Sequence, residues 1–398
     1  MLPAYVTARS VVSSVGVGCD PLESALRHKV SGLRPDHSVS GRLAGAGDFV
    51  GRLDGIESRE LPPALARFDC RNHRLANEAL GADGFDTAVA RARERYGADR
   101  VAVLVGTSTS GILSTETAYR QRLADGALPD WFDYRHAHNY AALPDFVRER
   151  LALNGPGQCV STACSSSAKV FAAAVRWLSL GLCDAAVVGG VDSLCGTTSY
   201  GFQALQVLSS KPCRPFDTDR DGISLGEGAA FLLLEREPHG EQPHAALLGY
   251  GESADAWHMS APHPQGLGAV GSMRAALTHC GLVAGRIDFT CAHGTATRAN
   301  DEIEARAIAS VLGAGALATS IKGTTGHTLG AAGALSALIA VLAIEHGFVP
   351  ATANTVEIDP MCPVTVPLQA RQQPIGAVLV NAFGFGGNNC SLIFGATA

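Results

Sequence analysis

The chain has 398 residues, 46% hydrophobic and 17% charged, a composition that is typical of a folded α/β protein and excludes a disordered one. Its net charge of −6 includes no basic block, which argues against nucleic acid as a partner. Its 11 cysteines are scattered without a C-x-x-C pair, which argues against a secreted disulfide framework and a structural zinc site, so we expect reduced thiols in the cytoplasm.

Two segments were compared with export and membrane signals, and neither has the features of one. The first residues lack a basic segment followed by an apolar run, so we expect no signal peptide. The longest apolar stretch, residues 329–344, carries several glycines and alanines and falls short of a membrane span. We therefore expect a soluble protein without a membrane partner.

The first half of the chain alternates apolar runs with helical patterns. Strands are expected at residues 5–17, with a turn at Gly16 and Gly18, and at 100–107, 183–191 and 228–235. Helices are expected at 20–27, 67–80, 86–96, 113–123, 140–153 and directly after Cys164. Asp20 would cap the first helix, with Pro21 at its first position. This alternation predicts a mostly parallel sheet covered by helices on both faces.

The second half repeats the same order of elements. Strands are expected at 245–252, 289–293 and 377–381, and helices at 302–312 and 329–346. The repetition predicts an internal duplication, with an N-terminal half at residues 1–240 and a C-terminal half at 241–398.

Cys164 lies in the stretch around which the chain is organised. An apolar run reaches Cys164, three serines follow, and Ala168, Phe171, Ala172 and Val175 then recur at helical spacing. This pattern places the thiol where a strand turns into a helix. Free N–H groups and the helix dipole favour an anion there, so we expect a lowered thiol pKa. The alternative is a buried cysteine that packs as a small hydrophobe.

Three glycine-flanked clusters follow in the second half. His293 ends a strand, Lys322 and His327 precede an alanine-rich helix, and Phe385 lies in a Gly-Phe-Gly-Gly loop after the last predicted strand. Each cluster alone fits a core histidine or a glycine turn; the spacing matches no common metal site or phosphate loop. Together with Cys164, however, they supply a nucleophile, polarising groups and oxyanion donors, which indicates acyl transfer.

The segments 162–167, 214–229, 292–297, 322–327 and 381–389 resemble signature blocks of the β-ketoacyl-acyl carrier protein synthases. The resemblance is to the elongating, Cys-His-His type of the thiolase superfamily, and it spans nearly the whole chain. It implies a thiolase-like α/β fold, with duplicated halves and mixed sheets in α-β-α-β-α layers. It also implies the decarboxylative Claisen condensation of an acyl chain with malonyl-acyl carrier protein, in fatty acid, polyene or polyketide biosynthesis.

The resemblance also implies partners and the absence of a resident cofactor or metal. Substrates would arrive on the phosphopantetheine arm of acyl carrier protein. The assembly would be a homodimer, with a heterodimer containing a non-catalytic chain-length-factor-like subunit as the alternative.

The roles of individual residues follow from the same resemblance. Cys164 would carry the acyl chain, and His293 and His327 would bind the malonyl thioester carbonyl. The amides of Cys164 and Phe385 would bind the oxyanion. Lys322 would order the histidines, with Glu304 as its charged partner.

Further family positions concern the route of the substrate. Thr295 and Thr297 match contacts to the pantetheine arm, and Phe385 matches a gate that admits malonate after acylation. A basic patch for the acidic carrier protein is expected from five residues: Arg67, Arg71, Arg74, Lys211 and Arg214.

The chain departs from the family pattern at three places. Ala296 replaces the usual Ser, Asn388 replaces the usual Thr, and the loop 107–113 is more polar than its glycine-rich counterpart. This loop is expected beside the acyl pocket, so the chain length is left open, and a specialised synthase that builds polyenes fits as well.

Other functions fit the sequence less well. A degradative thiolase usually has a second catalytic cysteine before its C-terminal glycine loop, where this chain has Phe383 and Phe385, and Cys390 comes after the glycines. An initiating synthase would have Asn in place of His327, and a non-catalytic chain-length subunit would lack Cys164. A cysteine hydrolase would need a water path to the thioester, and the sequence shows none.

Overall fold

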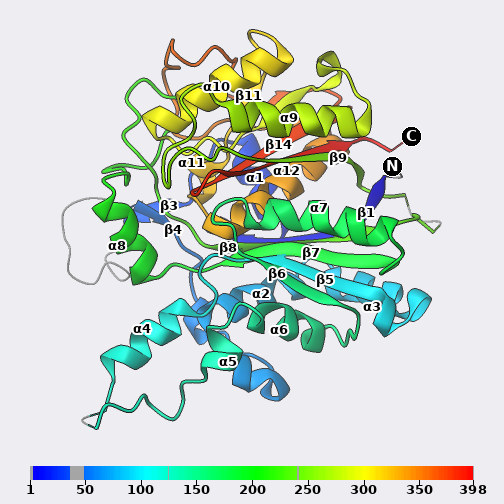
Figure 1. Cartoon of the computed structure of the whole chain (residues 1–398), viewed down its shortest axis with the longest axis vertical. Coiled ribbons are helices and arrows are strands. Elements are labelled where there is room, and N and C mark those ends of the chain that lie inside the picture. Colours follow the sequence, from blue (N-terminus) through cyan, green and yellow to red (C-terminus); the bar gives the residue numbers. More distant parts are fainter. Residues whose placement is uncertain (1–2, 36–48, 124, 240–241, 398) are drawn as a thin grey trace.

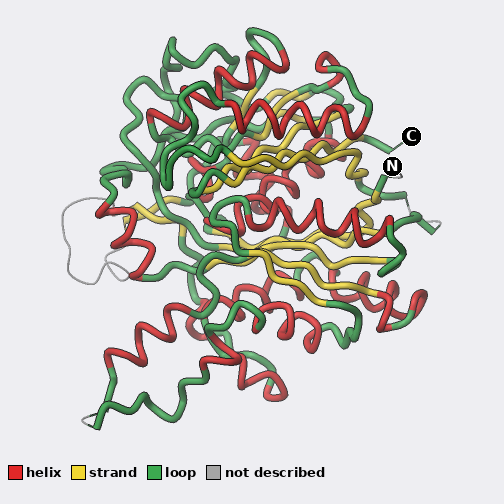
Figure 2. Tube along the Cα trace, in the orientation of Figure 1, coloured by secondary structure: helices red, strands yellow, loops and turns green. Residues whose placement is uncertain are grey.

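The computed structural model describes residues 3–35, 49–123, 125–239 and 242–397 (Figures 1 and 2). These residues form a sheet of 11 strands in the order β11-β10-β14-β15-β9-β1-β8-β7-β5-β6, with β2 paired to β1. The N-terminal strands are β1 (Ala4–Ser13), β2 (Gly16–Val17), β5 (Val101–Gly106), β6 (Gly157–Val160), β7 (Ala185–Asp192) and β8 (Gly228–Glu235). The C-terminal strands are β9 (Ala245–Ala254), β10 (Phe289–Cys291), β11 (Ala318–Thr319), β14 (Ala377–Gly384) and β15 (Asn388–Gly395).

The two halves of this sheet share one topology. Read outward from the β1–β9 pairing, the N-terminal order is β1-β8-β7-β5-β6 and the C-terminal order is β9-β15-β14-β10-β11. In each half the first strand pairs with the last, which runs antiparallel, and the three outer strands are parallel. The boundary between residues 240 and 241 lies outside the described residues.

The expectation of a mostly parallel sheet is wrong. Only four of the ten pairings in this sheet are parallel. The strand β8 is buried along its whole length, as a parallel strand would be, yet it runs antiparallel to both neighbours. A continuous apolar run reports burial of both faces and does not report strand direction.

Five layers result (Figure 1). The helices α7 (Ser166–Ser179) and α12 (Ala332–His346) lie between the two halves of the sheet, in one apolar core. The outer face of the N-terminal half is covered by α2 (Arg71–Gly81), α3 (Phe85–Tyr96) and α6 (Ala142–Arg150). The outer face of the C-terminal half is covered by α9 (Leu267–Cys280) and α10 (Arg298–Leu312).

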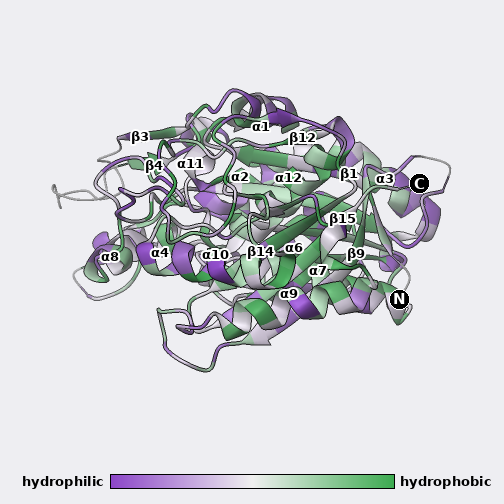
Figure 3. Cartoon of the chain, turned by 90° about the horizontal axis from the view of Figure 1, so that it is seen from above, coloured by the Kyte–Doolittle hydropathy of each residue, from purple (hydrophilic) through white to green (hydrophobic). Residues whose placement is uncertain are grey.

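The central position of α12 explains its apolar sequence. All its residues from Ala332 to Ala343 are buried, whereas α9 on the outside alternates between hydrophilic and hydrophobic residues (Figure 3). The helical stretch Leu329–His346 is long and apolar enough to span a membrane, contrary to the expectation, but 89% of it is buried inside the protein. A helix enclosed by two sheets needs apolar residues all round.

Several predicted boundaries shift. The turn after β1 falls at Ser14 and Val15, and α1 (Cys19–Arg27) begins after Gly18, so Asp20 is not its cap. The helix predicted for 67–80 is broken into a 3₁₀ turn, Pro63–Phe68, and α2.

The remaining elements are short or peripheral. They are β3 (Leu33–Pro35), β4 (Phe49–Gly51), α4 (Ile112–Arg120), α5 (Tyr134–Ala137), α8 (Gly196–Ala204), α11 (Lys322–Thr325), β12 (Phe348–Val349) and β13 (Arg371–Gln372). The sequence patterns did not predict α8 or α9.

Candidate active site

The candidate site lies where the carboxyl ends of the parallel strands of both halves meet. Cys164 follows β6, His293 follows β10, Lys322 follows β11, and Phe385 follows β14. Ligand sites of α/β sheets lie at this edge because loops and helix N-termini converge there.

Cys164 is held in a sharp turn between β6 and α7. Ala163, the residue before it, has a φ of 53°, a conformation that costs free energy in a non-glycine residue. Gly384 packs against this turn, and a Cβ at Gly384 would lie 2.6 Å from the carbonyl oxygen of Thr162. The tight turn places the thiol at the N-terminal end of α7, as predicted.

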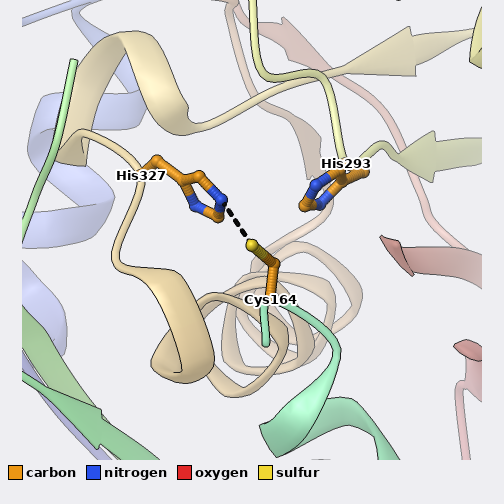
Figure 4. A group of neighbouring side chains, drawn as sticks. All are labelled: Cys164, His293 and His327. Carbon is orange, nitrogen blue, oxygen red and sulfur yellow. Dashed lines mark hydrogen bonds between the residues drawn. The ribbon is translucent and has the colours of Figure 1, made fainter. Parts of the chain in front are cut away.

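The structure brings both predicted histidines to the thiol (Figure 4). His327 Nε2 lies 3.0 Å from Cys164 Sγ. The rings of His293 and His327 are edge-to-face, with centroids 5.4 Å apart. All three residues are buried, so a substrate here would react away from bulk water.

Lys322 and Glu304 bind opposite ends of the His293 backbone and do not form the direct ion pair predicted from the sequence. The Lys322 ammonium donates to the His293 carbonyl oxygen. The Glu304 carboxylate accepts from the amides of His293 and Gly294, each at 2.8 Å. Because backbone N–H groups already occupy the Glu304 carboxylate, the charges of Lys322 and Glu304 interact without a direct contact. Both side chains hold the turn that contains His293.

Burial sets the protonation states. It lowers the pKa of His293 and His327 well below the usual value, and the nearby Lys322 charge acts in the same direction, so both rings are neutral. Burial also lowers the pKa of Lys322, although Glu304 opposes it.

The predicted lowering of the Cys164 pKa is wrong. Burial raises the pKa of Cys164 to about 11, although Lys322 and the amides of Phe385 and Cys164 act in the opposite direction. Loss of hydration therefore outweighs the helix N-terminus at this thiol. The two amides that favour the thiolate are those predicted to bind an oxyanion.

The same three side chains are also a potential metal donor set. The ligand atoms of Cys164, His293 and His327 lie within 4.8 Å of one another. Sulfur and imidazole donors would suit a thiophilic ion. However, the fully buried Lys322 beside His293 would repel a dication, so the absence of a metal remains our expectation.

A cavity of about 280 Å³ opens over the thiol. Cys164, His293 and His327 line it, together with Thr295 and Thr297, the residues predicted to contact pantetheine. Thr297 also caps α10 by accepting from the Asn300 amide at 3.3 Å. The side chains predicted to react and those predicted to contact pantetheine therefore line one pocket.

Phe385 covers part of this cavity and stacks on Phe202, with ring centroids 5.6 Å apart and an interplanar angle of 27°. Phe202 belongs to α8, which the sequence patterns missed, so its place in the pocket was missed too. The low apolar periodicity of α8, in which only Gly196 is buried, left no signal of a helix.

A second segment of the pocket was also missed from the sequence. Asp255, Ser260, Ala261 and Pro262 line the cavity. This segment is joined to the Gly-Phe-Gly-Gly loop by two backbone hydrogen bonds, one from the Gly386 amide and one to the Gly387 carbonyl. It contains no short motif that could have identified it.

The polar loop at 107–113 is anchored by one buried carboxylate. Asp192, at the end of β7, accepts from the amides of Ser108 and Thr109 at 2.9 and 2.8 Å, and from the Gly330 amide at 2.5 Å. The hydroxyls of Thr107 and Thr109 donate to it as well. The polar residues of the loop thus satisfy a buried charge beside the site, which its sequence alone did not reveal.

The predicted basic patch is largely neutralised. The Arg71 side chain is 8% exposed and pairs with Glu227 and Glu57, so it cannot serve as a free surface cation. Arg67 pairs with Glu149, and Arg74 pairs with Asp69. None of these three arginines lines the cavity over the Cys164 thiol.

Comparisons with known proteins agree with this geometry. Residues 18–239 match the family described as "Beta-ketoacyl synthase, N-terminal domain", and residues 244–356 match "Beta-ketoacyl synthase, C-terminal domain". The chain is 32% identical to 3-oxoacyl-[acyl-carrier-protein] synthase 2 of Coxiella burnetii, an alignment that covers 98% of this chain and 97% of that protein.

Two solved structures are also similar to this chain over its whole length. One chain of a complex between a ketosynthase (ApeO) and its chain length factor (ApeC), from Xenorhabdus doucetiae, has a TM-score of 0.89 and 36% identity, covering 100% of this chain and 98% of that one. The ishigamide ketosynthase/chain length factor has a TM-score of 0.89 and 32% identity, covering 100% of both chains. The predicted thiolase-like fold is confirmed, and the chain belongs to the β-ketoacyl synthase family.

Proposed function

We propose that this protein catalyses the decarboxylative condensation of an acyl chain on Cys164 with malonyl-acyl carrier protein. The observation that carries the proposal is one buried thiol 3.0 Å from His327 Nε2, with a second neutral imidazole facing the same cavity. The similarity to 3-oxoacyl-[acyl-carrier-protein] synthases supports the substrate class.

The first step is acylation of Cys164. At neutral pH the thiol is protonated, because its pKa is about 11, so a proton acceptor is needed. His327 Nε2 takes the proton as sulfur attacks the acyl thioester, and then returns it to the departing phosphopantetheine thiolate. The amides of Cys164 and Phe385 stabilise the oxyanion formed on the way.

The second step uses the histidines as donors. Malonyl thioester enters with its carbonyl oxygen between His293 and His327; carbon dioxide leaves, and the remaining electron pair forms an enolate that the two N–H groups stabilise. The enolate carbon then attacks the acyl carbon and expels the Cys164 thiolate, which recovers its proton from solvent. The Nδ1 atom of His327 is buried and has no hydrogen-bond partner among the residues that the structure describes. No such partner fixes the ring tautomer, so Nε2 can accept in one step and donate in the other.

Intact-mass analysis tests the proposal. Wild type and Cys164→Ala are incubated with acyl-carrier proteins of several chain lengths and then with malonyl-carrier protein. We expect acyl mass on wild type alone, discharged by malonyl-carrier protein. Cys280→Ala, which removes a partly exposed thiol outside the cavity, is the matched control and should acylate normally. Undiminished condensation by Cys164→Ala would refute the mechanism.

A second subunit is supported by two poorly covered helices. Ala118 is the only buried residue of α4, and Gly196 is the only one of α8. The large side chains of Tyr119, Trp131 and Tyr134, on or near α4, are more than half exposed. A monomer rarely leaves so many aromatic side chains uncovered.

One measurement can identify the second subunit. The two similar structures described above, each of a ketosynthase with a chain length factor, support a heterodimer for this chain, and a second copy of the chain is the alternative. Light scattering on the purified protein distinguishes them: a dimer alone indicates self-association, whereas a monomer that cannot be acylated until a chain-length-factor-like protein is added indicates a heterodimer. We place the enzyme in the cytoplasm, without a resident cofactor, because both substrates arrive on a carrier protein.

A further inference from the structure

Asn381 is a buried amide on β14 with a defined partner at each end. Its side chain is 1% exposed. Nδ2 donates to Glu304 Oε1 at 3.1 Å, and Oδ1 accepts from the Ser391 hydroxyl at 2.8 Å. Ser391 Oγ is in turn 2.9 Å from Ser272 Oγ on α9. Asn381 therefore joins the outer helix layer to the carboxylate behind His293.

Glu304 is the next link toward the site. It is 1% exposed, and its carboxylate accepts from the amides of His293 and Gly294 at 2.8 Å each. A buried carboxylate stays ionised only while donors compensate its lost hydration. Burial raises the pKa of Glu304 and the nearby Asp301 carboxylate acts in the same direction, whereas the two amides and the Asn381 side chain oppose that rise.

The direction of the hydrogen bonds fixes the orientation of the Asn381 amide. An ionised carboxylate can only accept, so Asn381 must present its NH₂ group to Glu304 and its oxygen to Ser391. The donor-to-acceptor direction therefore runs from Ser391 to Asn381 and from Asn381 to Glu304, and Glu304 also accepts from the N–H of His293. On the other side of the same residue, Lys322 holds the His293 carbonyl.

We propose that Asn381 is a positioning residue for malonyl decarboxylation. Its amide keeps Glu304 ionised and in place, and Glu304 fixes the turn that carries His293. The inference rests on the proposed function for its activity assay. It predicts that the two half-reactions separate, because acylation needs Cys164 and His327, which this network does not touch.

The test is Asn381→Asp, which keeps the shape and replaces the donating NH₂ with a carboxyl oxygen. At high pH the new carboxylate would face Glu304, and two adjacent carboxylates cannot both stay ionised without a large penalty. At low pH the new carboxyl group is protonated and donates to Glu304 again. We expect carbon dioxide release from malonyl-carrier protein to fall about tenfold or more below wild type at pH 8, and to recover toward wild type near pH 6. Acyl loading of Cys164 should change by less than about twofold.

A second readout does not depend on activity. The new carboxyl group has a raised pKa in the folded protein, so its stabilising contribution is present at low pH and is lost as pH rises. The melting temperature of Asn381→Asp should therefore fall further below wild type at pH 8 than at pH 6. This result is expected even if wild type fails to condense, so failure of the proposed function is distinguishable from failure of this inference.

Asn72→Asp is the matched control. Asn72 is also fully buried and donates its Nδ2 to the Val191 carbonyl at 3.2 Å, with no link to Glu304. This variant should be less stable but should not lose decarboxylation selectively over acyl loading. An equal loss of both half-reactions in Asn381→Asp, or a loss independent of pH, would overturn the inference.

If Asn381→Asp does not fold, Ser391→Ala provides the test. It removes the donor to Oδ1 and leaves the amide free to rotate away from Glu304. We expect carbon dioxide release to fall severalfold while acyl loading is retained. Unchanged decarboxylation in Ser391→Ala would contradict the network.

Discussion

Alkylation of Cys164 by iodoacetamide should rise steeply with pH. The pKa of the thiol is about 11, so roughly one molecule in ten thousand holds a thiolate at pH 7. Because the thiolate is the reacting species, the rate should increase about tenfold per pH unit between pH 7 and 10. Peptide mass spectrometry after timed alkylation follows this residue separately from the other ten cysteines of the chain.

Acyl loading should show a shallower pH dependence. In that reaction His327 Nε2, 3.0 Å from Sγ, removes the proton, so no preformed thiolate is needed. His327→Ala removes the acceptor, and its acyl loading should then become as steep with pH as alkylation. A plateau of wild-type alkylation, with a midpoint below about pH 9, would refute the argument that burial outweighs the helix N-terminus at Cys164.

Three further predictions concern the surroundings of the thiol. Lys322→Met removes the charged donor to the His293 carbonyl, a hydrogen bond that contributes about 2 kcal/mol. Carbon dioxide release from malonyl-carrier protein should therefore fall roughly 30-fold, and an unchanged rate would contradict this prediction. Phe202→Ala removes the ring that stacks on Phe385, so decarboxylation without prior acylation should increase severalfold, and equal uncoupled rates would exclude a restraining role for the stack. Gly106→Ala places a Cβ 2.4 Å from a backbone nitrogen in the first turn of α7, so calorimetry should show a loss of about 1–3 kcal/mol in stability, and an unchanged melting temperature would argue against this close packing.

Much of the candidate site could be predicted because its chemical groups lie in short, recognisable segments of the sequence. Cys164 was placed at the start of α7 from the serines and the helical spacing after it, and α7 begins at Ser166. His293 and Phe385 each follow a predicted apolar strand, so their position at a sheet edge was also predictable, whereas the two-residue strand β11 before Lys322 was not predicted. Local pattern suffices here because secondary structure and loop position depend on neighbours in sequence.

Other features depended on partners that are distant in sequence. The antiparallel direction of β8 is set by pairing with β1, more than 200 residues away, while its apolar run would suit either direction. The resemblance implies that Lys322 and Glu304 are charged partners, yet the backbone of His293 lies between them. Phe202 was missed because α8 buries almost nothing and so shows no apolar period.

The sequence by itself determined which groups meet in the candidate site: a thiol at a helix N-terminus, two imidazoles, an ammonium and an amide-bearing loop. The tertiary structure alone decided how those groups ionise and what holds them. Burial between two halves of a sheet removes water from Cys164, His293 and Lys322, and that loss of hydration shifts each pKa toward the neutral form. The hydration of a group depends on all the residues packed around it, so it cannot be predicted from the spacing of residues along the chain.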